Sequence, residues 1–152
     1  MTGTFACVFI SLYAAHHLGD HWLQTGWQAL TKEKPGRTGR TACIRHVCTL
    51  TLGKAVFLTV MCAVLDVRLP LAGCALGFAL DASSHYWADR RFRLRRLTKA
   101  LGKIQYWDRC TVVRSPHKEA KDTGPGTGSF HLDQSWHIVW MFVSSLVIVG
   151  LS

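Results

Sequence analysis

The chain has 152 residues, 49% of them hydrophobic, and a formal net charge of +9 from 18 Lys and Arg against nine Asp and Glu. Its length is typical of one domain, and we treat residues 1–152 as one. Eleven of the basic residues lie between positions 90 and 121 and four between 32 and 40, whereas the segments around them carry almost no charge. A soluble basic domain would scatter its charges, so the composition favours an integral membrane protein.

Four segments are long and apolar enough to cross a hydrocarbon core of about 30 Å as helices. They cover residues 4–29, 43–66, 69–89 and 132–151, approximately. Backbone groups in lipid must be paired within their own helix, so the predicted fold is all-α, a four-helix transmembrane bundle. The alternative is a soluble protein with unusually apolar core helices, which the confinement of charge between the segments disfavours.

The first apolar run has no basic residue before it and no small-residue cleavage site after it. We therefore expect a retained helix rather than a cleaved signal peptide. The six cysteines form no C-x-x-C pair, and we expect them to be reduced, space-filling thiols.

The distribution of basic residues predicts the orientation. The connection between the first two segments is basic, and so is the long loop at residues 90–131, whereas the connection between the second and third carries only Arg68. Basic loops face the cytoplasm. We expect a multi-pass protein of the bacterial cytoplasmic (inner) membrane, with both termini outside.

The long basic loop has two parts. Over residues 90–107, leucine and isoleucine recur at helical spacing among Arg and Lys. That pattern predicts an amphipathic helix in the membrane interface, between transmembrane helices three and four, drawn to anionic lipid head groups. Residues 114–129 are rich in Pro, Gly and Thr, which is typical of a flexible linker. Their glycine-rich stretch lacks the Lys-Ser/Thr ending of a phosphate-binding loop.

Histidine and aspartate recur three or four positions apart near the ends of the predicted helices. Residues at this spacing share one helix face, so each pair can aim at one point. The pairs are His17 with Asp20, His16 with Asp20, His85 with Asp89, and Asp133 with His137, and His46 adds a single imidazole. With alternating helix directions, all of them fall near the cytoplasmic boundary.

Two explanations of these pairs compete. Polar residues can simply decorate helix ends, with Asp133 as a helix cap. Ionisable groups within membrane helices are costly, however, and usually functional, so several pairs at one depth favour a shared site. Histidine and carboxylate ligands without thiolates suit Zn, Mn or Fe. We expect the metal ligands to be His17, His46, His85, Asp89 and His137.

Asp20 and Asp133 complete the expected site as catalytic residues. Asp133 is the candidate general base, and Asp20 could also hold or orient a ligand. Seven candidates exceed the four positions of a closed zinc site, so some must lie outside the first coordination sphere or two metals must bind. A separate prediction concerns Lys54 and Asp81, which lie at similar depth on antiparallel helices and are expected to pair.

Three runs of residues carry a resemblance to a known family. Residues 16–25, 84–91 and 132–137 resemble motifs of a bacterial and phage membrane family, domain of unknown function 3307. The likeness covers most of the chain apart from the linker. It implies a multi-pass membrane protein with matching His and Asp motifs and no established activity. More loosely, the pattern is similar to predicted membrane-bound metal-dependent hydrolases.

Two functional hypotheses follow. The first is a metal site at the cytoplasmic face that supports hydrolysis of a lipid-linked or membrane-proximal substrate. The second is a non-enzymatic membrane anchor or adaptor, whose basic loop binds anionic lipid, nucleic acid or a partner protein. A transporter is a weaker third hypothesis, because four short helices leave little room for a pathway.

Overall fold

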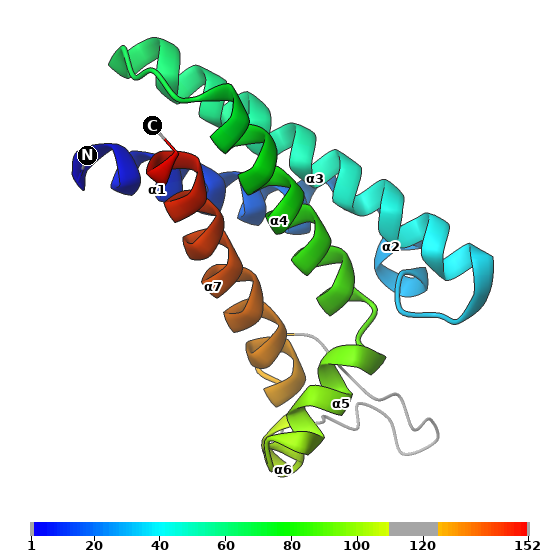
Figure 1. Ribbon diagram of the computed structural model, residues 1–152. Helices are drawn as coiled ribbons and strands as arrows, with labels where there is room; N and C mark the ends of the chain where they lie inside the picture. Colours follow the sequence, from blue (N-terminus) through cyan, green and yellow to red (C-terminus); the bar gives the residue numbers. More distant parts are fainter. Residues whose placement is uncertain (1, 110–124, 152) are drawn as a thin grey trace.

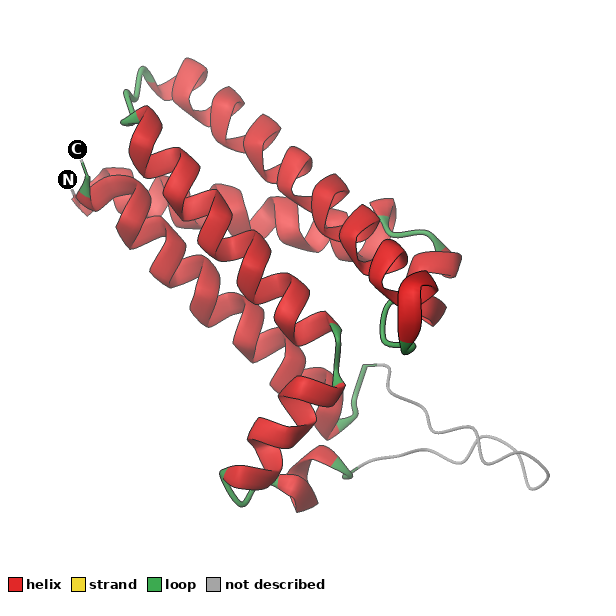
Figure 2. Cartoon of the chain, turned by 45° about the vertical axis from the view of Figure 1, so that its right-hand side comes forward, coloured by secondary structure: helices red, strands yellow, loops and turns green. Residues whose placement is uncertain are grey.

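The computed structural model describes residues 2–109 and 125–151, and this part of the chain is helical without strands. The predicted all-α class is therefore confirmed. Four long helices lie lengthwise in one bundle (Figures 1 and 2). They are α1 (Thr2–Leu18), α3 (Gly36–Leu65), α4 (Leu71–Asp89) and α7 (Gly128–Gly150).

The ends of the bundle differ. The two termini and the α3–α4 connection lie at one end, and the shorter helices gather at the other (Figure 1). Helix α4 packs chiefly along α7, whereas α1 packs against both α3 and α7. This arrangement brings the end of α4 and the start of α7 together, which is what positions the site described below.

The first predicted segment, 4–29, is not one helix. After α1 the chain makes a π-helical turn, η1 (Gly19–Leu23), and then starts α2 (Gly26–Thr31). The Thr25 hydroxyl accepts a hydrogen bond from the Gln28 backbone nitrogen at 3.2 Å. In return, the Gln28 side-chain oxygen accepts one from the Thr25 backbone nitrogen at 2.8 Å. This capping box starts a new helix, so the chain turns here instead of extending α1.

Two other boundaries also move. Helix α3 begins at Gly36, before the predicted start at 43, because its first residues are helical but too polar to belong to an apolar span. Helix α7 begins at Gly128 rather than at 132. There the Thr127 hydroxyl accepts a hydrogen bond from the Phe130 nitrogen at 3.2 Å, which caps the helix.

The predicted helix over 90–107 is divided in two. Helix α5 (Phe92–Ala100) and α6 (Ile104–Trp107) are separated by Gly102, whose φ of +68° ends the first of them. Leu94 and Trp107 pack with Ala88 in a small apolar cluster that fixes both helices against the bundle. Most of the predicted linker, residues 114–124, lies outside the described residues.

Two helices of the described chain, α3 and α7, are long and apolar enough to cross a membrane. Helices α1 and α4 do not meet the same measure, so four membrane spans are not established. Apolar side chains nevertheless point outward along all four long helices. Examples are Ile10, Val64, Leu71 and Val139, each more than half exposed.

The bundle interior contains an apolar cluster and a buried ion pair. The cluster includes Val8, Leu12, Leu58 and Ile148. The Lys54 ammonium, which is fully buried, contacts both carboxylate oxygens of Asp81 at 2.7 and 2.9 Å. The predicted pairing of these two residues is confirmed.

Close packing of α4 on α7 depends on glycine. A Cβ atom at Gly73 would stand 2.7 Å from the Ile148 carbonyl oxygen, which belongs to the backbone of α7. We expect Gly73→Ala to lower the free energy of unfolding in detergent by about 1–3 kcal/mol, because two helix backbones must separate.

A matched control for this substitution exists on α3. A Cβ atom at Gly53 would have its nearest neighbour at 3.9 Å, the end of the Leu23 side chain. Gly53→Ala should therefore leave stability unchanged or raise it, since alanine favours helix more than glycine does. Equal stability of the two variants would argue against close α4–α7 packing.

Candidate metal centre

Four separate elements bring histidine and aspartate to one point inside the bundle. Helix α3 supplies His46, α4 supplies His85 and Asp89, α7 supplies His137, and the π-helical turn η1 supplies Asp20. The four residues on the long helices are at most 2% exposed. All five lie toward the end of the bundle away from the termini, as the alternating helix directions predicted.

The shortest distances in this cluster are those from His46 and His85, and they can be compared with the spacing of ligands around a tetrahedral ion. His46 Nε2 lies 3.1 Å from Asp20 Oδ1, 3.2 Å from His85 Nε2 and 3.5 Å from Asp89 Oδ2. His85 Nε2 lies 3.3 Å from Asp89 Oδ2 and 4.0 Å from Asp20 Oδ1. Ligand atoms 2.0–2.2 Å from a tetrahedral ion stand about 3.3–3.6 Å apart. The observed distances bracket that range.

His137 extends the cluster on the side of α7. Its Nε2 lies 3.9 Å from Asp89 Oδ1, and its ring stacks on that of His85 with centroids 4.0 Å apart. The ligand atoms of His85, Asp89 and His137 form a second group in which all lie within 4.8 Å of one another. Because His85 belongs to both groups, the cluster could hold one ion or two neighbouring ions.

Several buried atoms of the cluster have no hydrogen-bond partner among the described residues. They are Asp20 Oδ1, Asp89 Oδ2, Asp133 Oδ1 and His137 Nε2. Buried polar atoms are nearly always paired, and an unpaired one costs roughly 1–3 kcal/mol. A cation among them would give these lone pairs a partner, so the donor set fits a metal ion.

Other side chains contact the carboxylates from outside the cluster. Lys32 Nζ lies 2.9 Å from Asp89 Oδ1. The Gln134 amide donates to Asp20 Oδ2 at 3.5 Å, and His16 Nε2 lies 3.5 Å from the same oxygen. Such contacts orient ligand oxygens and are typical of metal sites.

Lys32 keeps its charge in this position. Burial lowers the pKa of its amine, but the carboxylates of Asp89, Asp20 and Asp133 raise it by more, and the net shift is upward. The loop carrying Lys32 is fixed by Arg90, whose guanidinium donates to the Lys32 and Lys34 carbonyl oxygens at 2.6 and 2.8 Å. A positive charge is thus held beside the cluster.

The chain was compared with protein-family models, curated proteins and solved structures, and none of them matches it. Membership of the family that the sequence motifs resemble therefore stays a prediction. The geometry of the site is therefore the basis for its proposed chemistry.

The structure places most of the predicted site residues together. His46, His85, Asp89 and His137 converge, and Asp20 lies among them rather than beside them. Asp133 is adjacent: its Oδ2 lies 3.6 Å from His137 Nε2.

His17 lies apart from both ligand groups. Its ring packs on Tyr13 at 4.6 Å and on His21 at 5.6 Å. His16 instead has the inward-facing position beside the cluster that was expected for His17. It is fully buried, and its ring centroid lies 5.4 Å from that of His85. The spacing of four between His16 and Asp20 was the sequence signal for this.

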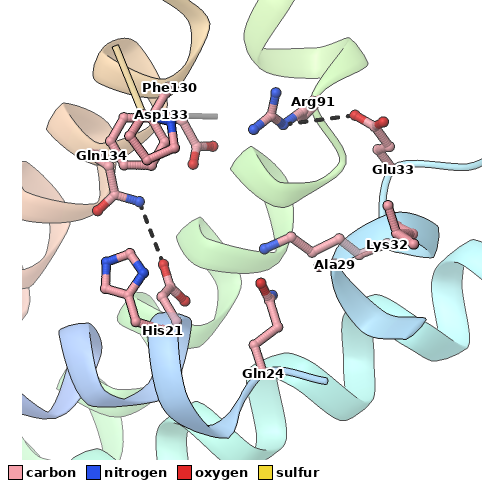
Figure 3. A pocket seen from close by; sticks show the side chains of 12 residues that line it. His21, Gln24, Ala29, Lys32, Glu33, Arg91, Phe130, Asp133 and Gln134 are labelled. Atoms are coloured by element: carbon pink, nitrogen blue, oxygen red, sulfur yellow. Dashed lines mark hydrogen bonds and ion pairs between the residues drawn. The ribbon is translucent and has the colours of Figure 1, made fainter. Parts of the chain in front are cut away.

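A pocket of about 370 Å³ opens beside the cluster (Figure 3). Asp20 and Asp133 line it on the side of the cluster, and the other walls come from the end of α2 with Lys32, the start of α7 and the α4–α5 connection. Solvent or a substrate can therefore reach the carboxylates from this side. Lys32 and the pocket were not found from the sequence, because both depend on the turn that α2 makes.

Proposed function

We propose that this chain is a multi-pass membrane protein that binds a divalent metal ion at its cytoplasmic face and hydrolyses a membrane-proximal substrate. The observation that carries the proposal is the pair of ligand groups that share His85, one with Asp20 and His46 and the other with Asp89 and His137, which four different elements bring together. The pocket beside them gives the substrate a place. Kinship with the family of unknown function that the motifs resemble, and with membrane-bound metal-dependent hydrolases, belongs to the same proposal.

The membrane part of the proposal extends from two helices to four. Outward-pointing apolar side chains on α1 and α4, such as Ile10 and Leu76, resemble those on α3 and α7. In water such a surface would be unfavourable, whereas lipid would cover it. From the basic connections we propose that the cluster faces the cytoplasmic side of a bacterial inner membrane, with both termini outside.

The donor set narrows the choice of metal. It consists of imidazole nitrogens and carboxylate oxygens, and neither ligand group contains a cysteine. Such sets suit Zn, Mn or Fe. When bound, the ion would lower the pKa of a coordinated water to about 7 and so supply hydroxide near neutral pH.

The chain's own residues have distinct roles in this proposal. Asp133 lines the pocket, and its unpaired Oδ1 can accept a proton there, as a general base must. Asp20, predicted as catalytic, is better placed as a ligand, with the Gln134 amide and His16 holding its other oxygen. Lys32 neutralises part of the negative charge on Asp89.

Metal content of the protein purified in detergent tests this proposal. We expect one or two equivalents of Zn, Mn or Fe per chain and release of product from an activated ester only in the metal-loaded protein. Asp133→Asn should keep the metal but lower the hydrolysis rate by about 10²–10⁴-fold, as removal of a general base does. Protein without metal, or activity that is independent of it, would refute the proposal.

A second candidate function rests on helix α5. The guanidinium groups of Arg90, Arg93 and Arg96 lie 5.7–5.9 Å from the Phe92 ring centroid. Phe92, Arg93, Arg95 and Arg96 are exposed, so a basic surface with one aromatic ring faces outward. An adaptor could use it to bind anionic lipid head groups or, less directly, nucleic acid.

Binding of a peptide covering α5 to vesicles tests this second function. Each basic residue near an anionic surface contributes about 1 kcal/mol. The peptide should therefore become helical on anionic vesicles and not on neutral ones, and a version with Arg93, Arg95 and Arg96 changed to Gln should lose about 3 kcal/mol of binding. Equal binding to both kinds of vesicle would exclude an electrostatic role for α5.

A further inference from the structure

The pocket beside the metal cluster has hydrogen-bond donors that metal binding does not use. Lys32, Arg91 and Gln24 approach its centre from the side of α2 and the α4–α5 connection, opposite Asp133 and Gln134 (Figure 3). Lys32 contacts the cluster through Asp89. Arg91 and Gln24 belong to neither ligand group.

Two donors that line the pocket have no acceptor among the described residues. They are Arg91 Nη1 and Gln24 Nε2, both buried from solvent. Arg91 does contact Glu33, but through Nε and at 3.7 Å, so that contact leaves Nη1 unpaired. A buried donor without an acceptor is costly. The two unpaired donors therefore point to an anionic or strongly polar ligand that enters from the pocket.

We propose that this pocket binds a phosphate group of the substrate, which makes the hydrolase a phosphoester hydrolase. The inference rests on the proposed function, because the metal cluster would act on the ester held here. Arg91 and Gln24 would donate to one pair of phosphate oxygens, and Lys32 would lie between these oxygens and the cluster.

The number of donors favours phosphate over carboxylate. A carboxylate has two oxygens with about four acceptor sites, so three donors and a cation would use all of them and crowd both oxygens. A phosphate ester has enough terminal oxygens for both, and Arg is the residue best suited to such oxyanions. Three carboxylates also line the pocket, those of Asp20, Glu33 and Asp133. Glu33 contacts Arg91 Nε at 3.7 Å, which partly offsets its charge. Asp20 and Asp133 lie on the side of the cluster, where the ion would offset their repulsion of an anion.

The phosphate could belong to a soluble ester or to a lipid head group, since the pocket lies at the end of the bundle that we place at the membrane surface. The chemistry that recognises it is the same in both cases. Inorganic phosphate therefore serves as the first probe, and mixed micelles containing phosphatidic acid serve as the second.

Calorimetric titration of the full chain in detergent tests the proposal, with metal content measured in every sample. We expect inorganic phosphate to bind the wild type and to bind Arg91→Gln about tenfold more weakly or worse, the loss typical of a hydrogen bond to a charged group. Arg91→Lys should recover part of the affinity. Arg40→Gln, which removes an exposed arginine outside the pocket, should bind like the wild type.

The outcomes separate this inference from the proposed function. Unchanged binding in Arg91→Gln, or an equal loss in Arg40→Gln, overturns the phosphate site even if metal is present. If no sample contains metal, the proposed function fails, whereas binding that depends on Arg91 would still support an anion site. Phosphatidic acid that competes at much lower concentration than inorganic phosphate identifies a lipid substrate, and equal competition identifies a soluble one.

Discussion

Replacing His85 by alanine should lower the affinity of the purified protein for zinc by more than about 100-fold, which exceeds the usual effect of an outer contact. His85 is the one imidazole that belongs to both ligand groups. Its Nε2 lies within 3.3 Å of both His46 Nε2 and Asp89 Oδ2. Competition with a chromophoric chelator measures the affinity directly.

Two variants calibrate this result. Gln134→Ala removes the amide that holds Asp20 and should weaken zinc by about 10-fold, as loss of an outer partner does. His131→Ala removes an exposed imidazole that belongs to neither ligand group and should change nothing. If His85→Ala binds zinc as tightly as His131→Ala, the cluster is a hydrogen-bonded polar core and not a metal site.

Lys54→Met alone should lower the free energy of unfolding by about 3–5 kcal/mol, because it leaves the Asp81 carboxylate buried without its partner. Asp81 is 3% exposed, and the described chain offers it Lys54 at 2.7 Å. The double variant, Lys54→Met with Asp81→Leu, should recover most of the loss, since two apolar side chains of similar volume can replace a buried ion pair.

The difference between the double variant and the sum of the single variants measures the coupling. We expect coupling of at least about 2 kcal/mol, measured by denaturant-induced unfolding in detergent. Strictly additive effects would mean that Lys54 and Asp81 are stabilised separately, in contradiction to the paired geometry.

Helical periodicity explains why much of the site could be predicted. His85 and Asp89 lie four residues apart within one uninterrupted helix, and so do Asp133 and His137. In such a helix a spacing of four fixes a common face. The depth of Lys54 relative to Asp81 followed from the same regular rise along antiparallel helices.

Prediction failed where the chain leaves the regular α-helix. The capped turn at Thr25 redirects the chain, so Lys32 returns to the cluster instead of lying in a remote loop. The choice of His17 over His16 failed for a related reason, because both have helical spacing to Asp20 and only the packing of α1 decides which of them faces inward. Neither outcome depends on local sequence alone.

Packing inside the bundle also explains why α4 is less apolar than α3 and α7. Helix α4 carries Asp81, His85 and Asp89 on its buried side together with Gly73 and Gly77 against α7. These residues reduce its mean hydropathy while serving contacts inside the bundle. By length and apolarity, α3 and α7 are therefore candidates to cross a membrane, whereas α4 is not.

X-ray absorption spectroscopy at the zinc edge of the zinc-loaded protein tests the metal centre most directly. The geometry predicts a first shell of nitrogen and oxygen only, at about 2.0–2.2 Å, with outer-shell scattering from two or three imidazoles. The signal should disappear in a variant that lacks both His46 and His85. A sulfur shell at about 2.3 Å, or a shell without imidazole scattering, would contradict a centre built from these residues.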